Sequence, residues 1–241
     1  MENSLYVGLS SQLVLEENMN IIANNVANLA TPGYRGQNMI FREYIEEPRG
    51  MKEDISMVLD YGQYQMTDPG PVKITGGPLD VALIGPGFLG VQTPQGVQYT
   101  RAGNFSLTAD GVLINSTGMH VAGEGGGDIT IPTDAREINI DRNGNISTDQ
   151  GQVGKLMVVE FDNEQTLDPA GNGNYRADAP GKPAENTVVA QGKLEGSNVQ
   201  AVVEMTRMID VLREYQSVQK MMQSEHERMR TAIQRLARTN A

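Results

Sequence analysis

The stretch VQAVVEMTRMIDVLREYQSVQKMMQSEHERMRTAIQRLAR, residues 199–238, decides the fold of this chain. It lacks glycine and proline, and its apolar residues repeat every seven positions. One line comprises Met208, Tyr215, Met222, Met229 and Leu236, and a second comprises Met205, Leu212, Gln219, His226 and Ile233. Alternating steps of three and four predict a coiled-coil helix, roughly 60 Å long at 1.5 Å per residue. Such a helix needs a partner helix; the alternative is one amphipathic helix lying on its own domain.

A second helix is expected near the N-terminus, over residues 4–29. It has its own heptad line, made of Leu5, Gly8, Gln12, Leu15, Met19, Ile22, Val26 and Leu29. The sequence Thr31-Pro32-Gly33 ends it, because proline constrains the residue before it and glycine accepts positive φ. Since long helices are expected at both ends of the chain, we predict that they pair.

The first helix is unusually rich in asparagine, a mediocre helix former. Asn20, Asn24 and Asn28 share one face, and Asn18 and Asn25 share another. Asparagine in a helix contact can fix register at some cost in stability. We therefore predict specified packing for these residues; an indifferent polar face is the alternative.

The rest of the chain has the pattern of a turn-rich β structure. Residues 34–75 read as an extended linker that becomes a β element, with turn signals at 60–62 and 68–71. From about residue 76 short strand-like runs alternate with turns, including Asp110-Gly111 and Asn143-Gly144, and residues 163–183 read as a long loop. The predicted fold is α+β, with an N-terminal helix (1–33), the linker (34–75), a central β domain (76–195) and a C-terminal coiled-coil helix (196–241).

The composition of the chain argues against several classes of partner and site. The 241 residues have a net charge of −11 and no cysteine. The charge disfavours nucleic acid and anionic membranes as partners, and the fold uses no disulfide or thiolate metal site. No apolar run approaches membrane-spanning length. The N-terminus lacks the positive region of a cleavable secretory signal, so we expect any export to follow another route.

Two apparent motifs do not predict sites. Residues 85–90 match G-x-G-x-x-G, but a strand rather than a helix follows, so we expect a glycine-rich turn and no nucleotide. The run from Asp141 to Asp149 resembles a calcium loop, yet its glycine stands fourth instead of sixth and Gln152 replaces the bidentate glutamate. With only two histidines, His120 and His226, no catalytic site, metal site or cofactor is expected.

Three motifs together resemble one family. Ala23-Asn-Asn-Val-Ala-Asn28, followed by Leu29-Ala-Thr-Pro-Gly-Tyr34, is similar to the N-terminal signature of bacterial flagellar rod and hook axial proteins. The runs 78–83 and 99–105, PLDVAL and YTRAGNF, resemble their central β motif, and LEGSNV at 194–199 resembles their C-terminal signature. The length and the short stretch between Tyr34 and Gly76 favour a proximal rod subunit over a distal rod or hook protein.

The resemblance implies a structural, non-enzymatic subunit of the periplasm-spanning rod in the flagellar basal body. Its implied partners are other rod subunits, copies of itself and the flagellar export apparatus, without nucleic acid or direct membrane insertion. A β-domain binding module on a coiled-coil stalk is the competing class. The assembly interface is expected to include Asn20, Ala23, Asn24, Asn25, Val26 and Asn28, together with Met205, Met208, Leu212, Tyr215, Met222, Met229, Ile233 and Leu236.

Overall fold

The computed structural model describes residues 2–46 and 55–239, which form two compact units. The helical unit is built from residues 1–27, 37–65 and 200–241. The β unit is built from residues 28–36 and 66–199. The chain therefore passes between the units four times, and the β unit includes the short connection that follows the first helix.

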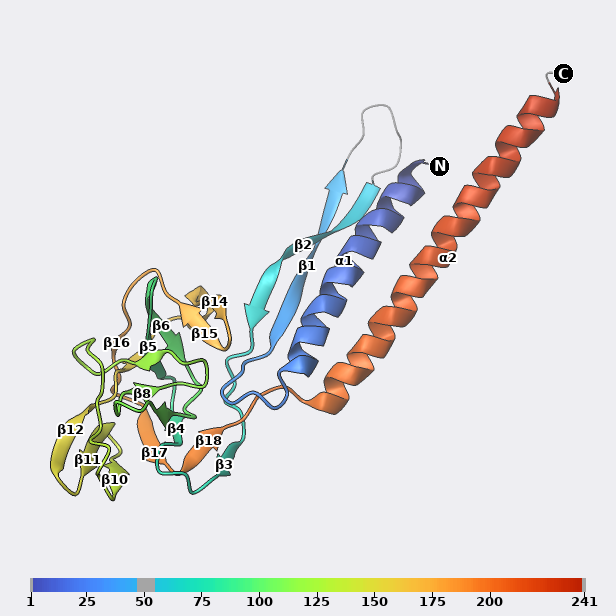
Figure 1. The fold of residues 1–241 in the computed structure, drawn as a ribbon. Coiled ribbons are helices and arrows are strands. Elements are labelled where there is room, and N and C mark those ends of the chain that lie inside the picture. The colour runs from blue at the N-terminus through green and yellow to red at the C-terminus, as the bar shows by residue number, and fades with distance from the viewer. Residues whose placement is uncertain (1, 47–54, 240–241) are drawn as a thin grey trace. The chain divides into compact units, whose positions relative to one another are not determined.

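The helical unit contains two long helices and one hairpin (Figure 1). Helix α1 spans Glu2–Ala27 and helix α2 spans Ala201–Thr239. They run antiparallel, because Gly8 lies beside Met222 while Asn25 lies beside Glu204. Helix α1 also packs on both strands of the hairpin. The predicted α+β class and the pairing of the terminal helices are confirmed.

The hairpin corrects one sequence prediction. Strands β1 (Gln37–Glu46) and β2 (Ile55–Gln65) pair antiparallel, so the predicted turn at 60–62 is wrong. Ile40 pairs with Gly62 and Phe41 pairs with Asp60, which leaves one extra residue on β2. This is a β-bulge, and Gly62 accommodates it with φ of 142°. The misreading has a physical origin, because bulges and turns favour the same residues.

The β unit is a set of short antiparallel strands. Its largest sheet has nine strands, seven of them in the order β14-β15-β6-β5-β9-β8-β7, with β13 paired to β5 and β16 paired to β13. The strands are β3 (Val72–Ile74), β4 (Val81–Ile84), β5 (Phe88–Thr93), β6 (Gly96–Thr100), β7 (Ser106–Leu107), β8 (Leu113–Ile114), β9 (His120–Val121), β10 (Ile138–Ile140), β11 (Asn145–Thr148), β12 (Gly151–Lys155), β13 (Val158–Glu160), β14 (Asp168–Gly171), β15 (Asn174–Arg176), β16 (Lys182–Pro183), β17 (Val188–Gln191) and β18 (Lys193–Glu195).

The predicted hairpin turns are confirmed, but the predicted long loop is not. Asp110-Gly111 joins β7 to β8, and Asn143-Gly144 joins β10 to β11. The segment 163–183 contains a short 3-10 helix, η1 (Glu164–Thr166), and a hairpin of β14 and β15. Asn172 and Gly173 both have positive φ at its tip. Strand β15 pairs with β6, and this pairing overrides the weak strand propensity of the segment.

The β unit has its own core. A cluster of buried aliphatic side chains includes Val81, Leu113, Ile131 and Leu156. A second cluster is aromatic, and in it Phe88 makes edge contacts with Phe161 and Tyr175 at centroid distances of 5.8 and 5.9 Å. These two clusters give the β unit the apolar interior of an independent domain.

Candidate assembly interface

The contact between α1 and α2 has an apolar centre. Leu15 and Ile22 of α1 are buried against Val211 of α2, and further side chains pack around them. These are Met19, Val26, Met208, Tyr215 and Val218. Gly8 stands at a close approach, since a Cβ there would lie 2.9 Å from Cγ of Met222. The heptad line expected in the first helix thus contributes Gly8, Leu15, Met19, Ile22 and Val26 to the contact.

Only one of the two lines expected on α2 faces α1. Met208, Tyr215, Met222 and Met229 are half-buried, whereas Met205, Leu212 and Ile233 are 51, 43 and 66% exposed. The line that completes the contact contains Glu204, Val211, Val218 and Glu225, one position earlier than expected. Both lines lie three or four residues from Met208, so the heptad rule alone cannot choose between them.

Helix α2 consequently presents a second heptad face, which we call the outer stripe of α2. Its members are all exposed and follow one another by three or four residues. They are Val202, Met205, Ile209, Leu212, Gln216, Gln219, Gln223, His226, Arg230 and Ile233. One helix therefore has two faces suited to helix packing, and within the described chain α1 occupies only the first.

Asn25 anchors the start of the hairpin to both helices. Its side chain is fully buried, donates to the carbonyl of Gln37 at 2.9 Å and accepts from the Gln37 N–H at 3.0 Å. It also donates to Glu204 Oε2 at 3.2 Å. Arg207 donates to Glu204 Oε1 at 3.0 Å and to Asn38 Oδ1 at 2.9 Å. The Asn25 side-chain amide thus hydrogen-bonds to the backbone of β1 in the way that a neighbouring strand would. Glu204 is buried, and its carboxylate accepts hydrogen bonds from Asn25 and Arg207.

The other asparagines differ from Asn25. Asn20, Ala23 and Asn24 are exposed on α1, whereas Val26 is half-buried in the helix contact. Asn28 belongs to the β unit and accepts a hydrogen bond from the Thr31 hydroxyl at 3.0 Å. The side chain of Leu236 lies outside the described part of the chain. Whether these residues contact other molecules stays a prediction.

The β unit contains a buried ion pair between two of the sequence motifs. Arg101 donates to Glu195 Oε2 from Nε at 2.9 Å and from Nη2 at 2.7 Å, and both residues are buried. Burial lowers the pKa of Arg101, and the charge of Glu195 opposes that shift. The guanidinium also donates to the carbonyls of Gly85 and Gly87. The G-x-G-x-x-G stretch is thus the expected turn, and its carbonyls bind an arginine.

Two glycines allow the motifs to approach closely. Gly33 has φ of +66°, and a Cβ there would lie 2.4 Å from the carbonyl carbon of Arg101. Its N–H donates to the carbonyl of Glu195 at 2.9 Å. At Gly70 a Cβ would lie 2.0 Å from the carbonyl oxygen of Gly196. The sequence motifs near residues 33, 101 and 195 are therefore in backbone contact.

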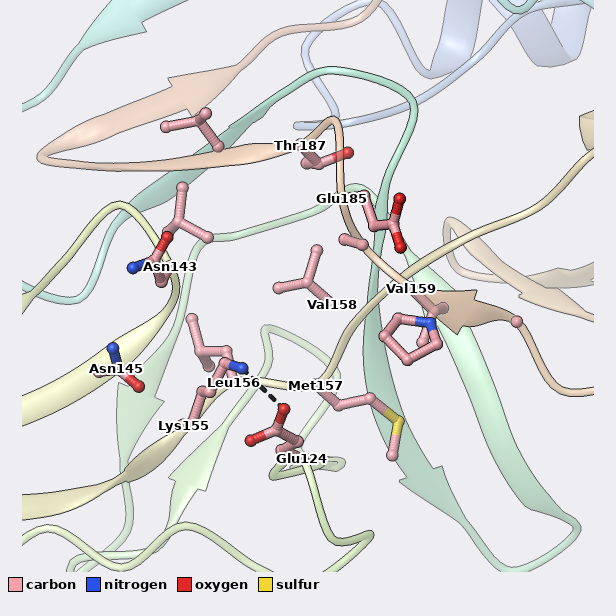
Figure 2. A pocket seen from close by; sticks show the side chains of 15 residues that line it. Glu124, Asn143, Asn145, Lys155, Leu156, Met157, Val158, Val159, Glu185 and Thr187 are labelled. Carbon is pink, nitrogen blue, oxygen red and sulfur yellow. Dashed lines mark hydrogen bonds and ion pairs between the residues drawn. The ribbon is translucent and has the colours of Figure 1, made fainter.

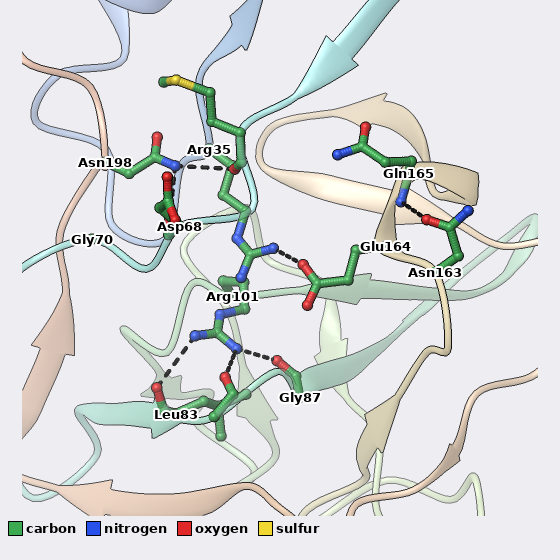
Figure 3. A network of polar contacts seen from close by, with 12 residues as sticks. Arg35, Asp68, Gly70, Leu83, Gly87, Arg101, Asn163, Glu164, Gln165 and Asn198 are labelled. Atoms are coloured by element: carbon green, nitrogen blue, oxygen red, sulfur yellow. Dashed lines mark hydrogen bonds and ion pairs between the residues drawn. The ribbon is translucent and has the colours of Figure 1, made fainter.

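Asn198 ties together three segments by which the chain enters or leaves the β unit. Its Oδ1 accepts from the Gly36 N–H at 2.8 Å, and its own N–H donates to the carbonyl of Tyr34 at 3.2 Å. Its Nδ2 donates to the carbonyls of Met66 and Asp68 at 3.0 and 2.9 Å (Figure 3). One side chain thus fixes the spacing of these segments.

Sequence reasoning missed Arg35. Its side chain is buried, forms an ion pair with Glu164 and lies 5.2 Å from the ring centre of Phe88. Arg101 lies 5.8 Å from the same ring. A lone arginine after a turn gives no local signal of burial, because its partners come from distant segments.

Comparisons with known proteins agree with this arrangement. Three family models match: "Flagella basal body rod protein" at residues 5–35, "Flagellar hook protein FlgE/F/G D1 domain" at 82–148 and "Flagellar basal body rod FlgEFG protein C-terminal" at 190–235. The flagellar basal-body rod protein FlgF of Caulobacter vibrioides is 36% identical, with complete coverage of both chains. FlgF of Rhizobium meliloti is 32% identical over 98% of each chain, and FlgG of Bacillus subtilis is 31% identical over 94% of this chain and 96% of its own.

The chain belongs to the flagellar basal-body rod protein family. The resemblance of the three sequence motifs is thereby confirmed. Gly33, Arg101 and Glu195 each belong to one of these motifs, and they lie together in the β unit. Asn25 belongs to the first motif and lies in the helical unit. The matched segments thus include buried contacts of both units.

The β unit also has a surface cavity of about 510 Å³ (Figure 2). Lys155 and Glu124 form an ion pair of 2.7 Å beside it; Lys155 is half-buried and Glu124 is exposed. The calcium-like loop is a capped hairpin turn, since Asp141 accepts from the N–H groups of Asn143 and Asn145. The Asn145 side chain, which also donates to it, lowers the pKa of Asp141. No metal-binding cluster occurs among the described residues.

None of the described helices has both the length and the apolar character needed to cross a membrane. Most exposed large apolar residues of α1 and α2 lie instead on heptad stripes that also contain polar side chains. Stripes of this kind suit packing against other amphipathic helices.

Proposed function

We propose that this chain is a structural, non-enzymatic subunit of the periplasm-spanning flagellar rod, and specifically a proximal rod protein. The outer stripe of α2 supports this proposal most directly. Its apolar part stays exposed although α1 already fills the neighbouring face. A helix with two such faces needs further helices as neighbours, as a subunit of a helical polymer would have.

The proximal position is favoured by similarity and length. Relatives named FlgF match over the whole chain, and the one from Caulobacter vibrioides covers it completely. A distal rod protein is the second candidate, because FlgG relatives also match over most of their length. Copies of the chain, other rod subunits and the flagellar export apparatus are the proposed partners.

The proposed task is torque transmission. Interlocked side chains between long helices resist twist and bending because protein interiors pack as densely as organic crystals. Contacts that repeat without closing generate a helical shaft. The polar stretch of the outer stripe, from Gln216 to His226, would add hydrogen bonds between neighbouring helices.

Swimming tests the proposal. In the source bacterium, replacing the chain by a version that ends at residue 198 should abolish swimming, because α2 is removed. A matched control is the exposed substitution Asp162→Asn in the otherwise complete chain, which should swim normally. Normal swimming of the truncated strain would instead support the β-domain binding module on a helical stalk.

Electron microscopy of the truncated strain separates the two rod positions. Loss of the proximal subunit should leave basal bodies without a proximal rod and therefore without the parts built on it. A rod of normal length that stops only at its outer end would favour the distal position. Immunoblotting of the truncated chain shows that it is still made.

A further inference from the structure

Helix α1 also has a heptad face that nothing in the described chain covers. We call it the outer stripe of α1, and its exposed members are Tyr6, Leu9, Leu13, Glu16, Asn20, Ala23 and Ala27. The first three are apolar and 61, 48 and 60% exposed. The same helix uses its other two faces to contact α2 and the hairpin.

The apolar parts of the two outer stripes match in reverse order. Along α1, the steps from Tyr6 to Leu9 to Leu13 are three and then four. Along α2 in the opposite direction, the steps from Leu212 to Ile209 to Met205 are also three and then four. An antiparallel contact would therefore bring together three pairs: Tyr6 with Leu212, Leu9 with Ile209 and Leu13 with Met205.

These pairs cannot form within one molecule. Because Gly8 lies beside Met222, Leu9 lies level with about residue 221 of its own α2. Ile209 is about twelve residues away along that helix, which is about 18 Å at 1.5 Å per residue. The matching surfaces must come from two molecules.

We propose that α1 of one copy packs antiparallel on α2 of a second copy through these three residue pairs. The inference rests on the proposed function and specifies the contact by which rod subunits join. The contact is heterologous and shifts each copy along the helix axis by about 18 Å. It therefore propagates without closing.

Charge favours the contact of α1 with α2 over contacts between identical helices. Helix α1 has three acidic residues and no lysine or arginine. Helix α2 has seven lysine or arginine residues and five acidic ones. Pairing two α1 helices would gather six carboxylates without a cation, whereas α1 on α2 joins helices of opposite net charge.

The size of the surface indicates when the contact forms. Six side chains that are each about half exposed present a few hundred Å² of apolar area, the size of a functional patch. A stable pair of proteins usually buries about 1,200 Å² or more. The contact is thus too small to hold two free subunits together, and it persists only where a polymer repeats it.

A second antiparallel register is possible in principle. It would pair Glu16 with Arg230 and Leu13 with Ile233. It offers one exposed ion pair and one apolar pair, and exposed ion pairs contribute little. Three apolar pairs bury more surface, so the first register is the one proposed.

Cysteine crosslinking tests the contact, and the natural chain has no cysteine to interfere. Two tagged copies, Leu9→Cys and Ile209→Cys, are expressed together in the bacterium, and purified basal bodies are treated with a short bismaleimide. We expect a crosslinked dimer with both tags, at least tenfold above a control that combines Leu9→Cys with Asp210→Cys. Asp210 is exposed but lies beside the stripe.

Four results would overturn the contact. Basal bodies that contain both copies but yield no dimer above the control would refute it. A dimer from Leu13→Cys with Ile233→Cys, without one from the first pair, would establish the second register instead. A crosslinked product with the mass of a different rod protein would show that the neighbour is not a second copy. Absence of the chain from basal bodies would refute the proposed function itself, and this contact with it.

Discussion

Arg101 and Glu195 lie 94 positions apart, yet each neutralises the other inside the β unit. A buried pair of this kind adds little net stability, but the loss of one partner leaves an uncompensated charge. The surrounding carbonyls of Leu83, Gly85 and Gly87 satisfy the remaining guanidinium donors. The pair therefore makes the fold depend on both motifs at once.

Replacing the carboxylate by an amide tests this dependence. We expect Glu195→Gln to lower the free energy of unfolding by about 3–5 kcal/mol, because Arg101 stays buried without a counter-charge. Urea unfolding followed by circular dichroism measures the loss. The matched control is Asp162→Asn, which breaks the exposed pair with Lys182 and should cost less than about 1 kcal/mol. Equal effects of the two variants would contradict the assignment.

Substitutions at two glycines distinguish the cost of a left-handed backbone from the cost of a close contact with a neighbouring backbone. Gly33 and Gly76 have similar φ angles, +66° and +73°, but only Gly33 has a neighbouring backbone within reach of a Cβ. Gly76→Ala should cost about 1–2 kcal/mol for the left-handed conformation alone. Gly33→Ala should cost clearly more, because the Arg101 backbone must also move. Thermal unfolding of both variants measures the difference, and similar melting temperatures would show that the approach near Gly33 relaxes freely.

At the scale of elements, Asn25 joins the end of α1 to β1 and α2. Asn25 satisfies both backbone groups of Gln37 and contacts the buried Glu204. Asn24 is exposed one residue earlier. The two positions thus offer a matched comparison within one signature.

We expect Asn25→Ala to destabilise the packing of α1, α2 and β1 by about 1–3 kcal/mol, since it leaves buried polar groups without partners. Asn24→Ala should cost clearly less than Asn25→Ala, because the Asn24 side chain is exposed. Hydrogen exchange at the Gln37 amide, compared with amides of the β unit, reports the local loss. Equal protection in both variants would show that the amide contact is dispensable.

The whole molecule combines a β unit that has two apolar clusters with a helical unit whose two outer stripes are exposed. Long helices with uncovered apolar faces are marginal in water. We expect trypsin to remove α2 from the free chain rapidly, with early cuts at exposed arginines such as Arg230. A resistant fragment should end at Arg207, which is the first trypsin site in α2, as mass spectrometry can determine.

The same digestion of assembled basal bodies is the control, because neighbouring helices should protect α2 there. Resistance of the full free chain would show that the terminal helices need no neighbours. In that case their folding is complete before assembly.

The sequence by itself determined the elements whose signals are local. Heptad spacing predicted both terminal helices, and Asp110-Gly111 and Asn143-Gly144 predicted two hairpin turns, because helix periodicity and turn chemistry depend on nearby residues. The pairing of the two helices also followed, since each has an apolar face without a local partner, but their antiparallel direction did not.

Only the tertiary structure decided which faces meet. Two lines on α2 satisfy the heptad rule equally, and the position of α1 selects the line with Val211 and leaves the line with Met205 and Leu212 exposed. In the same way, Asn25 is buried because Gln37 and Glu204 happen to lie beside it. Arg35 is buried because Glu164 reaches it from a segment 129 residues away. Burial depends on partners that are distant along the chain, and no local pattern specifies where those partners lie.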